Sequence, residues 1–199
     1  MKYTVMFHEF TQRSIQQLIG MYGPPKTVIE IGCFEGHTTF GLTEMLVQKN
    51  SNYKHYAIDP YDMSDDLALD VLNEAGQLFM SNLEEFKYKD NVEFIHDTSW
   101  NGLLKLLHRG VKADLIYIDG DHRAETVLND LVLAFGLVDV GGVILCDDSV
   151  SWKHQDSEKK YNLQSSPKLA VDNFIQCNWD KVEVLTLNNG YQTAFRKIK

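Results

Sequence analysis

Short apolar runs alternate along this chain with longer stretches in which apolar residues recur at helical spacing. The short runs, rich in β-branched residues, predict strands at residues 27–32, 55–59, 92–97, 113–119 and 143–146. The longer stretches predict helices at residues 37–48, 99–110, 123–138 and 166–176. Ser99 is the expected N-cap of the second helix, and Gly141 and Gly142 are expected to end the third helix and open the fifth strand. The last runs, 182–187 and 191–198, flank Asn-Asn-Gly and predict a β-hairpin.

Strands that alternate with helices, and strand runs that are apolar almost throughout, indicate an α/β fold with a mostly parallel sheet covered on both faces. No repeat or Ser/Gly-rich linker interrupts the 199 residues, so we expect a single domain with a helical lead-in over residues 1–26. The stretches 61–90 and 149–166 fit the alternation least. Both follow strand ends, where open α/β sheets bind ligands, so each is a candidate lid or a solvated insertion.

The composition narrows the class of protein further. The chain is 44% hydrophobic with a formal net charge of −9, which excludes a disordered chain and disfavours nucleic acid as a partner. Three cysteines without a C-x-x-C pair suggest reduced thiols. No basic leader or run of about 20 apolar residues is present, so we expect a cytoplasmic protein that does not contact a membrane; a homodimer is left open.

The first strand leads into a helix through the spacing E-x-G-x-x-x-G, which runs from Glu30 to Gly36. Glycine permits a tight turn and lets a ligand approach the backbone, while the helix N-terminus that follows offers N–H groups. Asp59 ends the second strand, where a carboxylate can accept both hydroxyls of a ribose. Asp97 and Trp100 follow the third strand, near the place of an adenine. Each signal alone is weak, since turn glycines and strand-end acids are often structural, and the G-x-G-x-x-G dinucleotide fingerprint is absent.

Acidic residues also follow the fourth and fifth predicted strands: Asp119 the fourth, Asp147 and Asp148 the fifth. If these strands are neighbours, about 4.8 Å apart, the three carboxylates converge. Converging carboxylates repel one another, and a cation would resolve that repulsion. Ligation by oxygen alone suits Mg²⁺, Ca²⁺ or Mn²⁺. The alternative is that one or two of these acids cap helices or loops.

His122 lies three residues past the fourth strand. The ordinary pKa of a histidine, about 6.5, lets it take a proton from a hydroxyl near neutral pH. In the alternative interpretation His122 is a neighbour of a helix N-cap or a partner of an aspartate.

These motifs together resemble the class I S-adenosylmethionine-dependent methyltransferases over residues 26–199. The pattern I-D-G-D-H-x(7)-D followed by G-G-x(3)-C-D-D is similar to the metal-dependent O-methyltransferases related to catechol O-methyltransferase, and closer to their smaller relatives that carry D-G-D-H. The resemblance implies a three-layer Rossmann-like sandwich. Its sheet would have seven strands in the order 3-2-1-4-5-7-6, with an antiparallel C-terminal hairpin.

The resemblance also assigns roles to particular residues. It implies S-adenosylmethionine as cofactor, with Asp59 on the ribose and Asp119 also in the site. The methionine part would be contacted by residues of the E-x-G-x-x-x-G turn and the helix that follows: Glu30, Gly32, Phe34, Gly36 and Thr38. The adenine would be contacted by residues after the third strand: Asp97, Thr98, Ser99 and Trp100. It implies a magnesium ion held by Asp119, Asp147 and Asp148. His122 stands where the catechol enzyme has a lysine base, and the third ligand there is asparagine, so the base and the substrate both depart from that pattern.

The implied reaction is methyl transfer to a hydroxyl of a small molecule or a sugar. An NAD-dependent oxidoreductase and a non-catalytic S-adenosylmethionine-binding protein are the alternatives. Asp59-Pro60-Tyr61 resembles part of the D-P-P-Y motif of nucleic-acid methyltransferases, but that motif follows the fourth strand. The acceptor would be selected by residues 1–26, 61–90 and 149–166, with Tyr61, Trp152 and Tyr161 as candidate lining residues.

Overall fold

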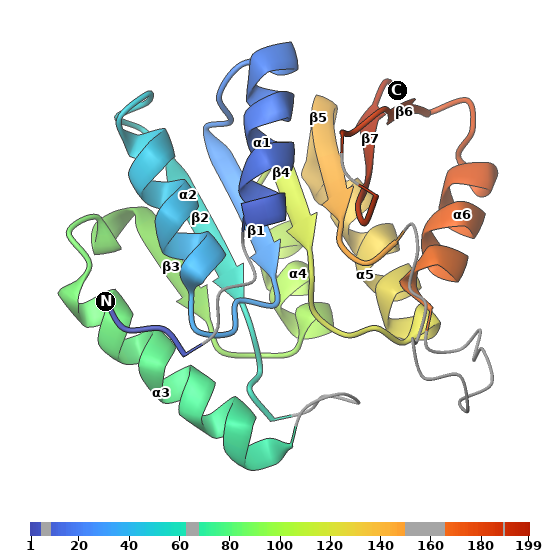
Figure 1. The fold of residues 1–199 in the computed structure, drawn as a ribbon. Helices are drawn as coiled ribbons and strands as arrows, with labels where there is room; N and C mark the ends of the chain where they lie inside the picture. The colour runs from blue at the N-terminus through green and yellow to red at the C-terminus, as the bar shows by residue number, and fades with distance from the viewer. Residues whose placement is uncertain (5–8, 63–67, 150–165, 189) are drawn as a thin grey trace.

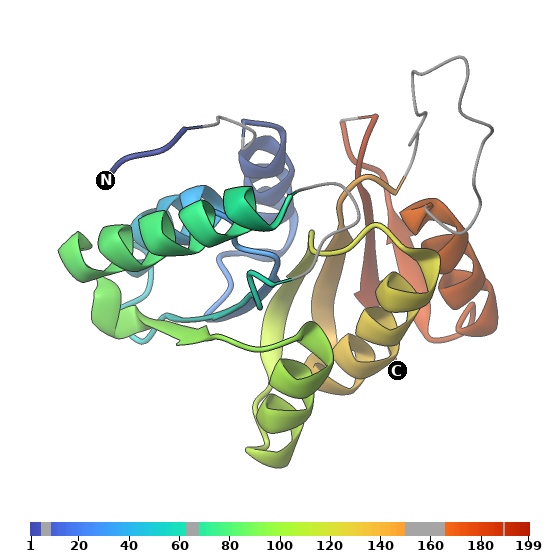
Figure 2. The same cartoon turned by 90° about the horizontal axis from the view of Figure 1, so that it is seen from below.

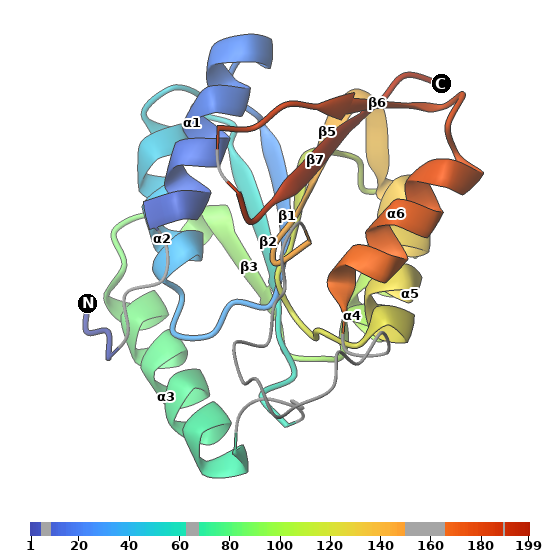
Figure 3. The same ribbon diagram turned by 45° about the vertical axis from the view of Figure 1, so that its right-hand side comes forward.

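The computed structural model describes residues 1–4, 9–62, 68–149, 166–188 and 190–199. Its strands form one sheet in the predicted order β3-β2-β1-β4-β5-β7-β6. Their bounds are β1 Thr27–Ile31, β2 Lys54–Ile58, β3 Val92–Ile95, β4 Ala113–Ile118, β5 Val138–Cys146, β6 Val182–Leu185 and β7 Thr193–Lys197. The pairs among β1 to β5 are parallel, whereas β7 runs antiparallel to both β5 and β6. Figure 3 shows this hairpin beside β5.

Helices cover both faces of the sheet, as the three-layer expectation requires (Figures 1 and 2). One face carries α1 (Glu9–Tyr22), α2 (His37–Val47) and α3 (Leu69–Glu85); the other carries α4 (Ser99–His108), α5 (Ala124–Leu137) and α6 (Pro167–Cys177). A short 3-10 turn, Lys89–Asn91, precedes β3. Among the described residues, we find no helix with both the length and the apolar character of a membrane span.

Alternation along the strands divides the core between the two faces. In β1, Ile29 and Ile31 belong to the cluster under α4, α5 and α6, whereas Val28 packs with residues of α1 and α2. Ile29 and Val28 are fully buried, and burying one such side chain stabilises the fold by roughly 1.5–3 kcal/mol. The predicted mostly parallel sheet is therefore buried on both sides.

Two predicted boundaries were wrong. Thr98, not Ser99, is the N-cap of α4: its hydroxyl accepts the backbone N–H of Asn101 (3.3 Å). Strand β5 begins at Val138, directly after α5, and includes Gly141 and Gly142. The register with β4 shifts across this segment, and Gly141 has a φ of 93°, so the glycines accommodate an irregularity inside the strand.

Part of the stretch 61–90, a candidate lid, is the long helix α3. Its buried residues include Leu72, Ala75 and Phe79, and the Phe79 ring lies 5.2 Å from that of Phe40 and 4.7 Å from that of Phe94. Helix α3 is thus a packed element of one helical layer. Residues 63–67, and 150–165 of the other candidate lid, lie outside the described residues.

A glycine that directly follows β1 lies close to the residue that follows β4. Gly32 has a φ of 82°, and a Cβ built on it would lie 2.0 Å from the carbonyl oxygen of Asp119. Gly23, after α1, has a similar φ of 85°, but a Cβ there would meet nothing within 4 Å. Substitution at Gly23 would therefore add backbone strain alone, whereas substitution at Gly32 would add backbone strain and a steric clash.

We expect Gly23→Ala to lower the free energy of unfolding by about 1–2 kcal/mol, the cost of a left-handed conformation with a Cβ. Gly32→Ala adds a clash with backbone to that strain and should cost roughly 3 kcal/mol or more. Urea unfolding of both variants measures the difference. Equal losses in the two variants would contradict the close approach of β1 to β4.

Candidate functional site

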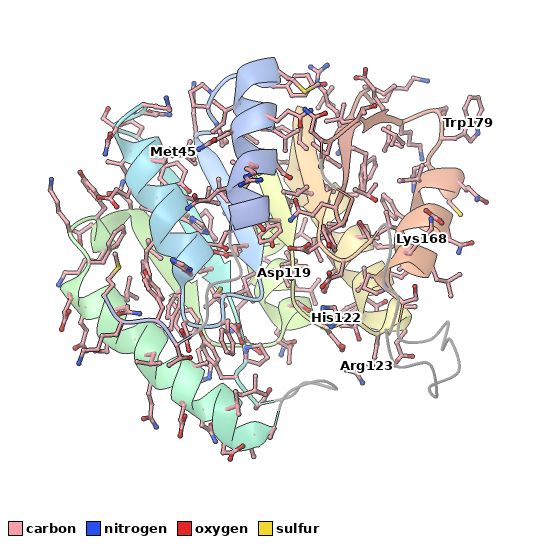
Figure 4. The ribbon with its side chains drawn as sticks, in the orientation of Figure 1. Met45, Asp119, His122, Arg123, Lys168 and Trp179 are labelled. Atoms are coloured by element: carbon pink, nitrogen blue, oxygen red, sulfur yellow. The ribbon has the colours of Figure 1, made fainter. Side chains whose placement is uncertain are left out.

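The predicted site residues gather at the edge of the sheet where the parallel strands end. The backbone N–H of Asp119 donates to the carbonyl of Ile31 (2.9 Å), and that of Asp147 donates to the carbonyl of Ile118 (2.9 Å). The ends of β1, β4 and β5 are therefore level, which brings the glycine turn next to the acids. Figure 4 shows Asp119 and His122 together at this edge.

The carboxylate of Asp59 is bound to the glycine turn. Its Oδ2 accepts the backbone N–H groups of Cys33 (2.8 Å) and Phe34 (3.1 Å), and its Oδ1 accepts the N–H of Tyr61 (3.0 Å). Burial raises the pKa of Asp59, although these three hydrogen bonds oppose the shift. Oδ1 keeps capacity to accept another hydrogen bond.

Tyr61 is buried below the turn. Its hydroxyl donates to the carbonyl of Phe34 (2.6 Å), and its ring packs near Phe79 and Phe94. The structure thus places Tyr61 in the support of the turn and not on an open pocket wall. Trp152 and Tyr161, the other candidate lining residues, lie outside the described residues.

The structure places Glu30 inside the core, with 1% of its surface exposed. Its Oε2 accepts hydrogen bonds from the Thr39 hydroxyl (2.5 Å) and from Nε2 of His55 (2.9 Å), and the Nδ1 of His55 lies 2.9 Å from the Tyr53 hydroxyl. Sequence reasoning placed Glu30 in the cofactor site. In the structure Glu30 joins β1, β2 and α2 through these hydrogen bonds and supports the turn from within.

Within the glycine turn, Gly36 is buried, whereas Phe34 and Thr38 are half-buried. Gly36 is the N-cap of α2, with a φ of 84°, and Thr38 lies half-buried in the first turn of that helix. Phe34, also half-buried, has a φ of 46°, a conformation that side chains seldom adopt. The N–H groups of Cys33 and Phe34 donate to Asp59, and that of Gly36 donates to the carbonyl of Cys33, so N–H groups for a ligand would come from the first turn of α2.

The loop after β3 is held by Asp97. Its carboxylate accepts hydrogen bonds from Nζ of Lys105 (2.6 Å), Nδ2 of Asn101 (2.9 Å) and the backbone N–H of Thr98 (2.8 Å). The Lys105 and Asn101 bonds lower the pKa of Asp97 to about 2. Trp100 is half exposed at the start of α4, where its indole is open to a planar ring.

Ser99 has a partner that sequence reasoning missed. Its hydroxyl bonds to the carboxyl group of Asp130, which is buried in α5. Removal from water raises the pKa of Asp130 to about 7. Asp130 is the final D of the pattern I-D-G-D-H-x(7)-D, so the motif itself contained the signal.

Within the part of the chain that the structure describes, the side chains of Asp119, His122 and Asp148 form a group that could hold a metal ion. Their ligand atoms lie within 4.8 Å of one another, and Nε2 of His122 is 3.2 Å from Oδ2 of Asp148. Asp147, an expected ligand, is not in this group. Its Oδ2 accepts hydrogen bonds from the hydroxyl of Tyr117 and from Nε2 of Gln192 (3.0 Å).

Tyr117 lies beneath the acids and connects them. Its hydroxyl contacts Oδ2 of Asp119 (2.7 Å) as well as Asp147. Burial raises the pKa of Asp119 well above its ordinary value, and the charge of Asp147 raises it further. The signal for Tyr117 was present in the sequence: residues two apart on a strand share a face, so its side chain points to the side of Asp119.

We expect Asp130 to make stability depend on pH. Its pKa is about 7 in the folded protein and about 4 in an unfolded chain, so the folded state binds more protons between these values. Stability should therefore fall as the pH rises through this window, by on the order of 4 kcal/mol from this residue. Asp130→Asn removes the effect, so its stability relative to the unmodified protein should be higher at pH 8 than at pH 5.

Urea unfolding at both pH values measures this difference. Asp172→Asn, at a half-exposed aspartate of α6 paired with Lys168, is the matched control for the loss of a carboxylate. A pH-independent effect of Asp130→Asn would contradict the assignment.

Comparison with known proteins supports the resemblance. A family profile described as "Methyltransferase domain" matches residues 29–149, more than half of the chain. Over 126 residues the chain is 29% identical to the uncharacterized protein R132 of Acanthamoeba polyphaga mimivirus, covering 61% of this chain and 51% of that relative. The chain thus spans about half the length of the relative that it matches.

Solved structures show the same fold. An O-methyltransferase from Bacillus cereus, in complex with SAH, superposes with a TM-score of 0.70 at 18% identity, over 98% of this chain and 84% of its own. The O-methyltransferase TomG of tomaymycin synthesis from Streptomyces achromogenes, in complex with SAM, gives 0.69 at 16% identity, over 95% and 80%. With the sheet order and the glycine turn, the match over residues 29–149 shows that this chain belongs to the methyltransferase domain family.

Proposed function

We propose that this protein transfers a methyl group from S-adenosylmethionine to a hydroxyl of a small acceptor, with a divalent cation beside the acceptor. The observation that carries the proposal is the juxtaposition at one edge of the sheet of the glycine turn, capped by Asp59, and the group Asp119, His122 and Asp148. The contact between Gly32 and Asp119 joins the two halves directly. The proteins of similar fold described as O-methyltransferases in complex with SAH or SAM support it.

The turn supplies what the proposed cofactor needs. Bound S-adenosylmethionine brings a methyl group already activated by the positive sulfur. Asp59 would accept the ribose hydroxyls through the capacity left on Oδ1, while the carboxylate keeps its bonds to the turn. Trp100, half exposed at the start of α4, would cover the adenine.

The acid group, Asp119 and Asp148 with His122 beside them, offers ligand atoms that fit a divalent cation. Two carboxylates and one imidazole converge within 4.8 Å, and the pKa of Asp119 is raised by burial and by the charge of Asp147, which a cation would offset. The carboxylate oxygens of Asp119 and Asp148 suit Mg²⁺ and Mn²⁺. Such a cation, when bound, would lower the pKa of the acceptor hydroxyl.

We assign His122 the role of proton acceptor for the hydroxyl. Its side chain is partly exposed, as a base that must reach the hydroxyl of a bound substrate requires. An oxygen of Asp148 lies 3.2 Å from its Nε2, where it would orient the ring and stabilise the protonated form. A histidine that works as a base remains beside the cation and does not hold it. That distinction is testable.

For the cofactor we expect Asp59→Ala to weaken binding of S-adenosylhomocysteine by about tenfold to several hundredfold, since charge-assisted hydrogen bonds are worth roughly 1.5–3 kcal/mol each. Isothermal titration measures the affinity. Asp114→Ala is a matched control, because Asp114 also accepts two backbone N–H groups, from Lys26 and Thr27, but at the opposite edge of the sheet. Binding of NAD in place of S-adenosylhomocysteine would favour the oxidoreductase alternative.

For the reaction we expect chelation to abolish transfer of labelled methyl groups from S-adenosylmethionine to small molecules of a cell extract, and Mg²⁺ or Mn²⁺ to restore it. His122→Ala should reduce the rate by roughly 10²–10⁴-fold at saturating cation, without loss of cation affinity. His108→Ala, in the last turn of α4, is the control. Loss of cation binding with His122→Ala would make this residue a ligand and not the base. Cofactor binding with no transfer to any acceptor would favour a non-catalytic protein.

A further inference from the structure

The hydroxyl of Tyr117 lies at the centre of a buried hydrogen-bond network beneath the acid group. It contacts Oδ2 of Asp119 (2.7 Å), Oδ2 of Asp147 and the Thr11 hydroxyl (3.0 Å). Gln192 completes the network, because its Nε2 donates to the Thr11 hydroxyl (3.0 Å) and to Oδ2 of Asp147 (3.0 Å). Four segments meet here: α1, β4, the residue after β5 and the residue before β7.

The network has no direct access to a substrate. Tyr117 is 1% exposed, and Thr11 and Gln192 are each 3% exposed. Any effect of these side chains on chemistry at the edge must therefore pass through the acids that they contact.

Both carboxylates of the proposed cation site, Asp119 and Asp148, are connected to this network. Asp119 is held through Oδ2, which leaves its other oxygen for a ligand. Asp148 is held through its backbone, because its N–H donates to Oδ1 of Asp147 (2.9 Å). Asp148 has a φ of 48°, a costly conformation for a residue with a side chain, and the hydrogen bond that its N–H donates to Asp147 helps to maintain it.

We propose that Tyr117 is a positioning residue of the cation site, and that Asp147 supports the two carboxylates Asp119 and Asp148 without itself holding the ion. The inference rests on the cation of the proposed function. Partners that fix the orientation of metal ligands typically contribute 10–100-fold to metal affinity. The ring of Tyr117 would stay packed in a phenylalanine variant, so Tyr117→Phe removes the hydroxyl alone.

Isothermal titration with Mn²⁺ tests the proposal directly. We expect Tyr117→Phe to weaken Mn²⁺ binding by about 10–100-fold, while the affinity for S-adenosylhomocysteine stays unchanged. Tyr53→Phe is the matched control: its hydroxyl is also buried and hydrogen-bonded, to His55, away from the acid group, so Mn²⁺ affinity should not change.

A second variant guards against misfolding. Thr11→Val preserves shape and removes one partner of the Tyr117 hydroxyl, so it should weaken Mn²⁺ binding in the same direction by a smaller factor. Thermal unfolding checks that each variant is folded, and if Tyr117→Phe does not fold, Thr11→Val carries the test alone.

Unchanged Mn²⁺ affinity in folded Tyr117→Phe would overturn the proposal. Tighter binding would also overturn it, because a released Asp147 would then be acting as a ligand. Absence of Mn²⁺ binding to the unmodified protein would overturn both the inference and the cation of the proposed function. The expected loss of Mn²⁺ affinity supports the inference even where no acceptor is methylated, so the two failures are distinguishable.

Discussion

The site depends on how the repulsion among acids at one edge of the sheet is balanced. Asp119 and Asp147 follow neighbouring parallel strands, whose spacing of about 4.8 Å forces their carboxyl groups together. Burial removes the water that would otherwise screen them, which is why the pKa of each is raised. The Tyr117 hydroxyl between them has a single proton to donate, so it relieves the repulsion only in part. The remaining negative charge is directed toward the open edge, where Asp148 and His122 lie.

The same edge joins the glycine turn to the acids through bare backbone. Because Gly32 has no Cβ, the end of β1 reaches the carbonyl of Asp119, and the turn lies beside the acid group. The glycine turn is itself held from two sides. The Asp59 carboxylate accepts its backbone N–H groups, and the buried Glu30 is hydrogen-bonded to Thr39 and His55. The glycine turn and the acid group are therefore held in one relative position, which suits a reaction that needs two groups aligned.

Much of this arrangement could be predicted from the sequence. The hydrophobic patterns predict the strands and helices, and the family resemblance adds the strand order and so the edge of the sheet at which the site residues meet. Asp119 and Asp147 had to meet once β4 and β5 were neighbours. The orientation of Asp147 could not be predicted, since it is decided by Gln192 and Thr11, which come from distant segments. The burial of Glu30 likewise depends on His55, a residue of another strand. Local patterns also misplaced the N-cap of α4 by one residue, because Thr98 and Ser99 are both good capping residues.

The balance of charge also bears on the proposed cofactor. S-adenosylmethionine carries a positive sulfur, whereas the product S-adenosylhomocysteine has lost that charge with the methyl group. Where no cation offsets their charge, the carboxylates beside the turn would attract the substrate form more strongly than the product form, through Coulomb interactions that partial burial strengthens. The acids that destabilise this edge in isolation would then assist both cation binding and release of the spent cofactor. Hydrogen bonds from Tyr117 to Asp119 and from Gln192 to Asp147 offset part of the repulsion among these acids, whether or not a ligand is bound.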